Sequence, residues 1–464
     1  MNPNLFMTKR NLVQACLLGL LFFLSAAAQA QFTFTTNNGA ITITGYNTAA
    51  GLNMVIPAAT NGFPVTSIGV EAFFGSSLTS VSIPSSVTSI GEDAFGYCDG
   101  LTSVTLPNSV TTIGIQAFFY CTGLTNVAIP NSVTSIGEAA FSDAGLTSVT
   151  IPNSITTIGE AAFEECYGLT SVTIPNGVTT IEDDAFGYCY NLTSVTIPSS
   201  VTSIGGKAFE ICYSLTSVTI PNSVTTIGGG AFSYCATLTN ITVAAANPAY
   251  SSLGGVLFDK AKATLIQFPA GLGGGYVITN SVTVITNSAF YNCYLLTSVV
   301  IPNSVTTIGN DAFSGCTSLT SVTIGNGLTN IADFLYGNFA FAGCSSLSSA
   351  YFLGNAPPND GTVFSSPAIV YYLAGTIGWG PTFGGVPAVL WNPQPNASNF
   401  TGGHFGFNLT GPANTVVVVD ACTNLSHAVW LPIATNIIPD NSTSAFSDLQ
   451  SGAHPTRFYR ERSP

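Results

Sequence analysis

The chain has 464 residues, with 8 Lys or Arg against 21 Asp or Glu and a formal net charge of −13. Only 6% of the residues are charged, whereas an ordinary soluble domain has about 25%. So few basic residues argue against nucleic-acid binding, which needs clustered Lys and Arg to neutralise phosphates. The 46% apolar content excludes a disordered chain. The three histidines, His404, His427 and His454, all lie near the end of the chain, which argues against a histidine-dependent metalloenzyme.

Residues 1–30 predict a secretory signal peptide. Lys9 and Arg10 precede an apolar run over residues 12–24, and Ala28-Gln29-Ala30 offers a small-residue cleavage site. The run is shorter than the roughly 20 residues that span a bilayer, and no later run is longer. We therefore expect cleavage after Ala30, no transmembrane span in the mature chain, and a secreted or cell-surface location outside the cytoplasm.

The body of the chain, residues 78–346, repeats the phrase L-T-S-V-T-I-P-N-S-V-T-T-I-G-x-x-A-F-x-x-C with a period of about 23 residues. The leucine that opens each copy is Leu78, Leu101, Leu124, Leu146, Leu169, Leu192, Leu215, Leu238, Leu296 or Leu319. A fixed period of this length is typical of a solenoid, in which neighbouring repeats stack to bury an apolar face that one repeat cannot bury alone.

Each repeat predicts one short strand and one compact turn or helix. In the copy that opens at Leu101, Val104 and Leu106 alternate with Thr as in a strand, and Pro107 ends it because proline cannot donate to a ladder. Gly114 permits a turn, after which the x-x-A-F segment is expected to form a short helical or 3-10 segment. The predicted fold class is a repeat solenoid, an arc of short parallel β-strands, with a small C-terminal β-rich domain.

A phenylalanine marks eleven of the expected coils and should be buried. These positions are Phe73, Phe95, Phe118, Phe141, Phe163, Phe186, Phe209, Phe232, Phe290, Phe313 and Phe341. An irregular insertion at 243–285 separates the eighth from the ninth and should add one or two atypical coils.

Acidic residues gather just before the Ala-Phe pair of the repeat, as in Glu92-Asp93, Glu138 and Glu160. If a helix begins there, these carboxylates lie at the positive end of its dipole and stabilise it. A calcium-binding ladder is the functional alternative, although the same slot holds Lys207 and Asn310 in other copies. We therefore expect helix capping and no metal site.

A cysteine follows the marker phenylalanine by three residues in nine copies. These are Cys98, Cys121, Cys166, Cys189, Cys212, Cys235, Cys293, Cys316 and Cys344. Equivalent residues of adjacent coils lie about one strand spacing, 4.8 Å, apart, which exceeds the Cβ separation that a disulfide prefers. We expect a ladder of buried free thiols that pack as small hydrophobes.

The repeat phrase resembles the BspA-type leucine-rich repeat of bacterial surface proteins, and the resemblance extends from about Gly39 to Leu347. Residues 31–77 resemble that family's N-terminal β cap with a first repeat, residues 243–285 its mid-array insertion, and residues 347–391 a closing segment. The resemblance implies a leucine-rich-repeat arc with a binding role, often in adhesion. It implies no catalytic residues and no cofactor, so we do not expect an enzyme.

Residues 392–464 predict a small β-rich module of different character. Phe405–Leu409 and residues 415–419 read as strands, and Trp430, Ile433, Phe446 and Phe458-Tyr459 are candidates for a core. A module of this size folds alone only marginally, so docking onto the end of the solenoid is expected. Arg457, Arg460 and Arg462 form either a solvated tail or a site for an anionic partner, and Cys422 has no evident mate.

The candidate binding site is the outward side of the repeat strands. Valines alternate with polar residues there, so the polar side chains should point outward together as an almost uncharged sheet of hydroxyls. The candidate residues are Ser103, Thr105, Asn126, Thr150, Thr173, Thr196, Thr219 and Thr323.

Three classes of function fit this face. The first is a scaffold for protein–protein interaction or adhesion, the second a carbohydrate or matrix binder, and the third an ice-binding protein that uses the Thr row, although Ala128 and Val300 interrupt that row. The expected partner is a protein or glycan on an extracellular surface, and not a nucleic acid. The competing explanation is that Thr occurs there for its β propensity alone.

Overall fold

The computed structural model describes residues 32–47, 52–332, 339–358, 361–365, 368–391, 395–401, 404–411, 416–423, 429–439, 443–451 and 457–462. The predicted signal peptide lies outside these residues. The described residues contain no helix long and apolar enough to cross a membrane. The chain divides into two compact units, Met1–Ala236 with Val243–Ala249 and Thr237–Thr242 with Tyr250–Pro464.

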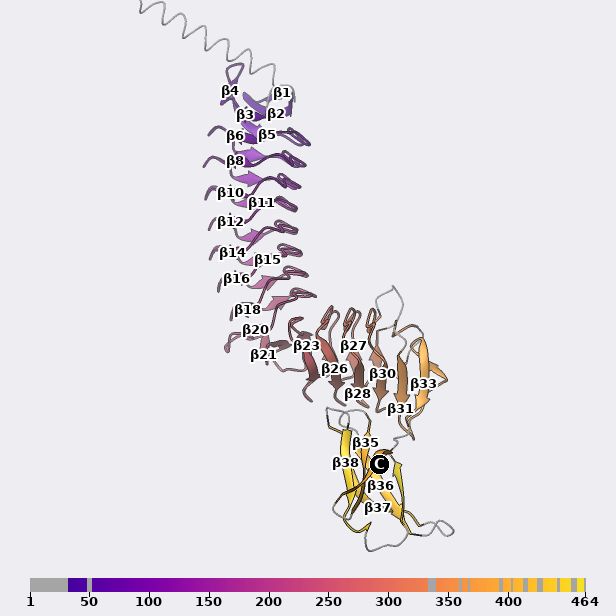
Figure 1. The fold of residues 1–464 in the computed structure, drawn as a ribbon. Helices are drawn as coiled ribbons and strands as arrows, with labels where there is room; N and C mark the ends of the chain where they lie inside the picture. The colour runs from indigo at the N-terminus through magenta and orange to yellow at the C-terminus, as the bar shows by residue number, and fades with distance from the viewer. Residues whose placement is uncertain are drawn as a thin grey trace, which may run out of the picture. The chain divides into compact units, whose positions relative to one another are not determined.

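The first unit opens with a small β cap (Figure 1). Its strands are β1 (Phe32–Asn37), β2 (Ala40–Tyr46), β3 (Asn53–Val55), β4 (Ala59–Thr60) and β5 (Phe63–Ile68). Strand β1 pairs with β2 in antiparallel fashion, and β2 pairs with β5 in parallel. The cap therefore covers the first apolar layer and starts the parallel ladder that the repeats continue.

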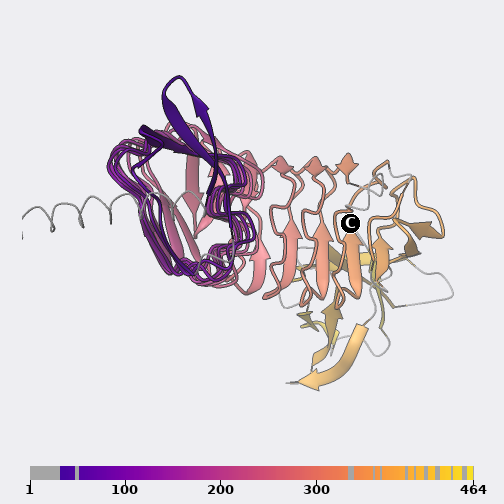
Figure 2. The same cartoon turned by 90° about the horizontal axis from the view of Figure 1, so that it is seen from above.

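In the first unit each repeat contributes two short strands to two parallel ladders, and the coils of this unit stack one on the next (Figures 1 and 2). The longer strands are β6 (Ser80–Ser82), β8 (Ser103–Thr105), β10 (Asn126–Ala128), β12 (Ser148–Thr150), β14 (Ser171–Thr173), β16 (Ser194–Thr196) and β18 (Ser217–Ile220). The shorter strands are β7 (Ser89–Ile90), β9 (Thr112–Ile113), β11 (Ser135–Ile136), β13 (Thr157–Ile158), β15 (Thr180–Ile181), β17 (Ser203–Ile204) and β19 (Thr226–Ile227). We call the outward side of the longer strands the strand face.

The prediction that the x-x-A-F segment forms a short helix or 3-10 segment is wrong. The segment forms a double turn instead. The residue before Ala has a positive φ, 49° at Asp93, and so does the residue before Cys, 56° at Tyr97. A right-handed helix cannot contain residues in this conformation. The helix-capping explanation for the acidic residues is wrong for the same reason, because these described residues form no helix N-terminus for the carboxylates to stabilise.

Hydrogen bonding between coils explains why this segment does not become a helix. The N–H groups of Asp93, Phe95 and Tyr97 donate to carbonyls of the next coil at 2.8–2.9 Å. The N–H groups between them close the turns, as when Gly96 donates to Asp93. The N–H groups of Asp93, Phe95 and Tyr97 thus have acceptors in the next coil, and that of Gly96 has one within the turn. Helical i→i−4 hydrogen bonds would only replace these bonds.

Glycine in the I-G pair lets successive coils approach closely. A Cβ added at Gly114 would lie 2.6 Å from the carbonyl carbon of Gly91, and one at Gly137 would lie 2.5 Å from that of Gly114. Real Cβ atoms do not tolerate such contacts, so a larger residue would push two coils apart at this point. Glycine therefore permits the closest approach at these two coils, whereas Glu182 and Thr286 occupy the same position in other coils.

The marker phenylalanines form the core. All eleven are at most 1% exposed, which confirms the prediction. In the first unit their rings stack nearly parallel from Phe73 to Phe232, with centroids 4.9–5.6 Å apart. In the second unit Phe268 of the insertion starts a similar stack that ends at Phe364.

The nine ladder cysteines are free and buried, as predicted. Eight of the thiols donate to the carbonyl of the marker phenylalanine in the preceding coil, for example from Cys121 to Phe95 at 3.1 Å, and Cys293 donates to that of Phe268. Burial raises the pKa of the Cys121, Cys166 and Cys189 thiols. The cysteine is thus both a small hydrophobe and a hydrogen-bonding link between coils, a role that the sequence did not indicate.

The second unit begins with the insertion and continues the coils. Its strands are β20 (Asn240–Val243), β21 (Tyr250–Leu253), β22 (Val256–Asp259), β23 (Thr264–Gln267), β24 (Gly274–Val277), β25 (Val284–Ile285), β26 (Leu296–Ile301), β27 (Thr307–Ile308), β28 (Ser321–Ile324), β29 (Asn330–Ile331), β30 (Ser349–Phe352), β31 (Ile369–Tyr372), β32 (Thr382–Phe383) and β33 (Val386–Leu390). Strands β21, β22 and β23 form an antiparallel meander, after which β23 pairs in parallel with β25. The insertion thereby returns the chain to the parallel ladder.

The C-terminal module consists of two three-stranded antiparallel sheets, β34-β35-β38 and β37-β36-β39. Their bounds are β34 (Pro395–Thr401), β35 (His404–Thr410), β36 (Val416–Cys422), β37 (Leu431–Ile437), β38 (Thr443–Asp448) and β39 (Phe458–Arg462). Phe446 lies in the core, but Phe458 is 37% exposed, so its predicted core role is wrong. Cys422 is free and buried.

The module packs onto the last coils of the second unit. Trp391 is part of the module's core, and Tyr351, Tyr371 and Leu373 from β30, β31 and the segment after it pack against that core. Docking supplies apolar contacts that a module of this size lacks on its own.

Two of the three terminal arginines are paired inside the module. Arg457 lies 3.1 Å from the Asp448 carboxylate, and Arg460 lies 3.0 Å from Asp420, which is 1% exposed. The Arg460 guanidinium also lies over the ring of Trp430, 4.7 Å from its centroid. Arg457, whose side chain is 10% exposed, is therefore not part of a solvated tail, whereas the Arg460 side chain is 48% exposed, and an anionic partner for the terminal arginines stays a prediction.

Replacing one ring of the phenylalanine stack should destabilise the first unit strongly. Phe163 is fully buried between Phe141 and Phe186, with centroids 5.5 Å from each. We expect Phe163→Ala to lower the free energy of unfolding by about 3–5 kcal/mol in a urea titration, because it leaves a cavity between two coils. Phe74→Ala, at a 47% exposed ring, is the matched control and should cost far less. Equal losses in the two variants would contradict the stacked core.

The buried thiols should be chemically inert in the folded chain. Burial keeps these thiols inaccessible, and the raised pKa of the Cys121 and Cys189 thiols also keeps their nucleophilic thiolate scarce. We expect labelling by iodoacetamide at about pH 8 to be slow under native conditions and fast in denaturant, with mass spectrometry reporting each cysteine. Rapid native labelling of Cys121 or Cys189 would contradict the buried ladder.

Candidate functional site: a groove along the strand face

The strand face presents most of the predicted binding residues in register. Thr150 of β12 pairs with Thr173 of β14, Thr173 pairs with Thr196 of β16, and Ala128 of β10 lies beside Thr150. Seven of the eight candidates are exposed, namely Ser103, Thr105, Asn126, Thr150, Thr173, Thr196 and Thr219. The alternating valines are buried, as expected, at 9% exposure or less.

Thr323 is the exception, because it is only 5% exposed. Its ladder partner in the next coil is Tyr351, whose ring stacks on that of Tyr371 at 5.1 Å. Both tyrosines pack against the C-terminal module. The outward row of the second unit is therefore occupied by aromatic rings and the docked module, and the expectation that Thr323 belongs to an exposed face is wrong.

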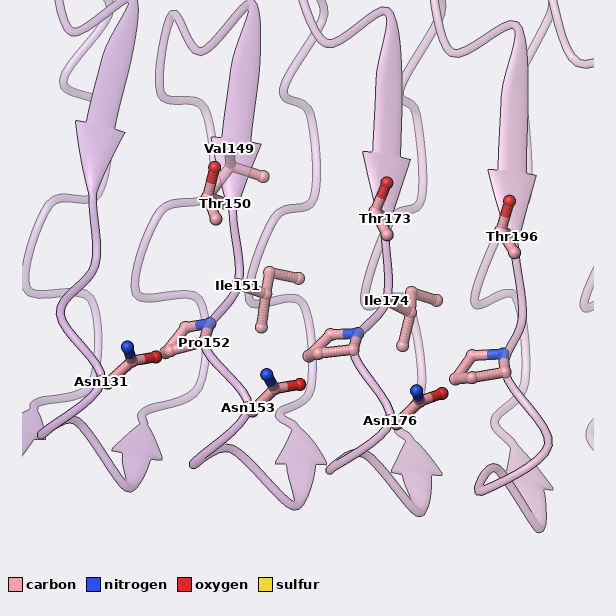
Figure 3. Close-up of a pocket in the computed structure, with 12 residues that line it drawn as sticks. Asn131, Val149, Thr150, Ile151, Pro152, Asn153, Thr173, Ile174, Asn176 and Thr196 are labelled. Carbon is pink, nitrogen blue, oxygen red and sulfur yellow. The ribbon is translucent and has the colours of Figure 1, made fainter.

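A groove of about 670 Å³ runs across three coils of the first unit, where the longer strands end (Figure 3). Its lining residues are Asn131, Val149, Thr150, Ile151, Pro152, Asn153, Thr173, Ile174, Pro175, Asn176, Thr196 and Pro198. Figure 3 shows the threonines at the strand tips and the asparagines along the opposite side, with proline rings between them. Three of the predicted residues, Thr150, Thr173 and Thr196, therefore meet at one site.

The asparagines and prolines of this groove were not among the predicted residues. Asn131, Asn153 and Asn176 are exposed and follow the proline that ends each strand. The signal was present in the repeated P-N-S and P-N-G phrases. The proline was interpreted only as a strand end, so the amide that comes after it was not assigned to the strand face.

Hydrogen bonding separates the groove threonines from the other threonine rows. In two other rows the hydroxyl donates to a threonine carbonyl of the preceding coil, as from Thr170 to Thr147 and from Thr202 to Thr179. Among the described residues, the hydroxyls of Thr150, Thr173 and Thr196 have no such partner. Two rows thus stabilise the coil stack, while the groove row keeps its hydroxyls available to solvent or a ligand.

The groove contains no charged residue, and the charges gather instead at the double turns. Burial, with the nearby carboxylates of Asp184, Glu165 and Asp143, raises the pKa of Glu164 to about 7. Burial and the neighbouring Glu165 raise the pKa of Asp143 to about 6. In the described part of the chain, no group of three or more His, Cys, Asp or Glu side chains is placed to hold a metal ion.

The parallel ladders, the stacked core and the repeat phrase define a leucine-rich-repeat solenoid. A family model described as the BspA type leucine rich repeat region, with six copies, matches residues 56–170, 156–273 and 276–368. These matches cover more than half of the chain, which therefore belongs to the BspA-type leucine-rich repeat family.

The chain is similar to two bacterial crystal structures. One is a leucine rich cell surface protein from Faecalibacterium prausnitzii, with 34% identity, a TM-score of 0.54, and coverage of 75% of this chain and 94% of that one. The other is a leucine-rich repeat protein from Bacteroides ovatus, with 26% identity, a TM-score of 0.46, and coverage of 69% and 93%. No curated protein matches the chain.

The crowded carboxylates predict that stability falls as the pH rises. The pKa of Glu164 is raised in the folded chain, so stability is fully present below about pH 4.5, its ordinary value, and declines as the pH rises through about 7. Glu164→Gln removes this charge and should reduce the loss of unfolding free energy between about pH 5 and pH 8. Urea titrations at both pH values measure the loss. Glu138→Gln, at an exposed carboxylate, is the control, and an equal effect of both variants would contradict the prediction.

Proposed function

We propose that this chain is a secreted or cell-surface binding scaffold that mediates adhesion or protein binding through the groove of the strand face. The observation that carries the proposal is the groove itself, where three threonine hydroxyls without coil-to-coil hydrogen bonds lie opposite three asparagine amides. β propensity accounts for threonine in a strand, but it does not account for a row of unpaired hydroxyls opposite a row of amides.

Membership of the BspA-type family and the likeness to a bacterial cell surface protein support this proposal. The extracytoplasmic location also rests on the signal peptide that residues 1–30 predict. A groove that repeats in three coils offers many weak contacts in place of one strong anchor, so affinity grows with the number of coils that a ligand spans. In the groove this arrangement supplies no nucleophile and no acid–base pair, so we propose binding without catalysis.

Filling the groove with positive charge should abolish binding. We expect the triple variant Thr150→Lys, Thr173→Lys, Thr196→Lys to remain folded, because all three side chains are exposed, and to lose at least about tenfold in affinity, or 1.4 kcal/mol. Binding of parent and variant to a panel of immobilised matrix proteins and glycans measures the effect, with circular dichroism to confirm folding.

The strands offer a matched control. Ser148, Ser171 and Ser194 lie on the same three strands, are exposed, and do not line the groove. Three lysines at these positions carry the same charge two residues away, and binding should persist. If the folded groove variant binds as well as the parent chain, the groove is not the binding site.

A further inference from the structure

The double turns build a second surface of the first unit, which presents aromatic rings to solvent. The most exposed of these rings, at 40–47% exposure, belong to Phe74, Tyr97, Tyr120 and Tyr167. Backbone hydrogen bonds place each double turn beside the next, as when the N–H of Tyr97 donates to the carbonyl of Phe119. We call this surface, formed by the double turns between residues 71 and 236, the turn edge.

The rings of neighbouring coils contact one another on the turn edge. The Tyr97 ring lies 5.3 Å from that of Phe74 and 5.2 Å from that of Tyr120, measured between centroids. Farther along the first unit, the rings of Tyr167 and Tyr190 lie 4.7 Å apart. Contiguous exposed apolar side chains of this kind typically mark a surface that binds a partner.

The double turn itself does not require an aromatic ring at these positions. Tyr97 and Tyr120 each follow the marker phenylalanine by two residues, and the next two coils have Asp143 and Glu165 at the same position. All four residues adopt nearly the same positive φ, between 55° and 57°. Rings and carboxylates therefore fit the same backbone, so the demands of the turn do not explain why rings occur here.

The turn edge also holds the charged residues of the first unit. Residues 32–236 contain thirteen Asp or Glu, all in or beside the double turns, but a single Lys and no Arg or His. That one basic residue, Lys207, lies 3.7 Å from the Glu210 carboxylate. The surface therefore has a large excess of negative charge that basic side chains of the first unit do not neutralise.

A carboxylate beside an aromatic ring is a combination that a guanidinium group binds. Arginine pairs with carboxylates and stacks on aromatic faces, whereas the ammonium group of lysine is a strongly hydrated point charge. The C-terminal module contains this arrangement, because the Arg460 guanidinium lies 3.0 Å from Asp420 and 4.7 Å from the centroid of the Trp430 ring. On the turn edge the Tyr167 hydroxyl donates to the Glu165 carboxylate, which places a ring and a charge together.

We propose that the turn edge binds an arginine-rich segment of a partner protein, with guanidinium groups that stack on the exposed tyrosines and pair with the neighbouring carboxylates. This inference goes beyond the proposed role of the groove, because none of these residues lines the groove. Attraction between exposed charges is screened by salt, so binding at the turn edge should weaken as the ionic strength rises.

The test uses fluorescein-labelled nonaarginine, with nonalysine as a comparison peptide of equal charge. Fluorescence polarisation at about pH 8 and about 0.15 M NaCl measures the affinity of each peptide for the folded chain, and Glu164, with a pKa of about 7, is mostly ionised there. We expect nonaarginine to bind at least about fivefold more tightly than nonalysine, and to lose at least about tenfold in affinity at about 0.5 M NaCl. Equal binding of the two peptides would overturn the inference.

Two double variants separate the rings from the carboxylates. Tyr97→Asn with Tyr120→Asn removes two rings, and asparagine tolerates the positive φ at both positions, so the chain should remain folded, as circular dichroism can confirm. Nonaarginine should bind this variant at least about tenfold more weakly. Glu164→Gln with Glu165→Gln removes two charges and should weaken binding about three- to tenfold. Ile115→Asn, at a 42% exposed aliphatic side chain of the same surface, is the control and should lose less than about twofold.

The triple lysine variant of the groove is the control for net charge. It adds three positive charges, one more than the carboxylate variant neutralises, yet it should keep the affinity for nonaarginine within about twofold, because exposed charges act mainly on close neighbours at this salt concentration. An equal loss in the two variants would indicate general attraction to a negatively charged chain and would overturn the inference. Unchanged binding to the folded tyrosine variant would overturn it as well, and neither result bears on binding in the groove.

Discussion

The parallel registration of one coil on the next is the constraint on which the rest of this structure depends. It brings backbones close together, as at Gly114 and Gly137, and it places phenylalanine rings face to face. It also determines which polar groups form hydrogen bonds between coils. Many backbone N–H groups, two threonine rows and the cysteine thiols form such bonds. Among the described residues of the strand face, the groove threonines are left without such bonds, and they face the asparagine amides of the groove.

Much of the solenoid could be predicted from the sequence, because the same pattern of apolar and turn residues occurs in every repeat. The buried phenylalanines, the inward valines and the free thiols were all predictable from periodicity and strand spacing. The double turn was not, because x-x-A-F has a composition that suits a helix, and only the hydrogen bonds from Asp93, Phe95 and Tyr97 to the next coil decide against it. A pattern read within one repeat cannot reveal bonds that exist only between repeats.

The candidate site was half predictable for a related reason. Thr150, Thr173 and Thr196 could be placed by alternation, whereas the asparagines of the groove lie beyond a proline and join the site only through the path of the chain after the strand. Thr323 shows the opposite error, since it stands in the same phrase as Thr173 but is covered in the folded chain. Its burial depends on Tyr351 in the following coil, and on a module whose docking no local pattern describes.

The contacts that hold coils together have a genetic consequence. Each stacked ring pair and each threonine link joins a residue to its equivalent one repeat away, and each thiol-to-carbonyl bond joins a cysteine to a phenylalanine of the preceding coil. A copy of about 23 residues can therefore be gained or lost as a unit, and most of these contacts form again between the new neighbours. The length of the groove then changes by one coil with each copy gained or lost. Related chains can therefore have longer or shorter grooves with the same contacts in each coil.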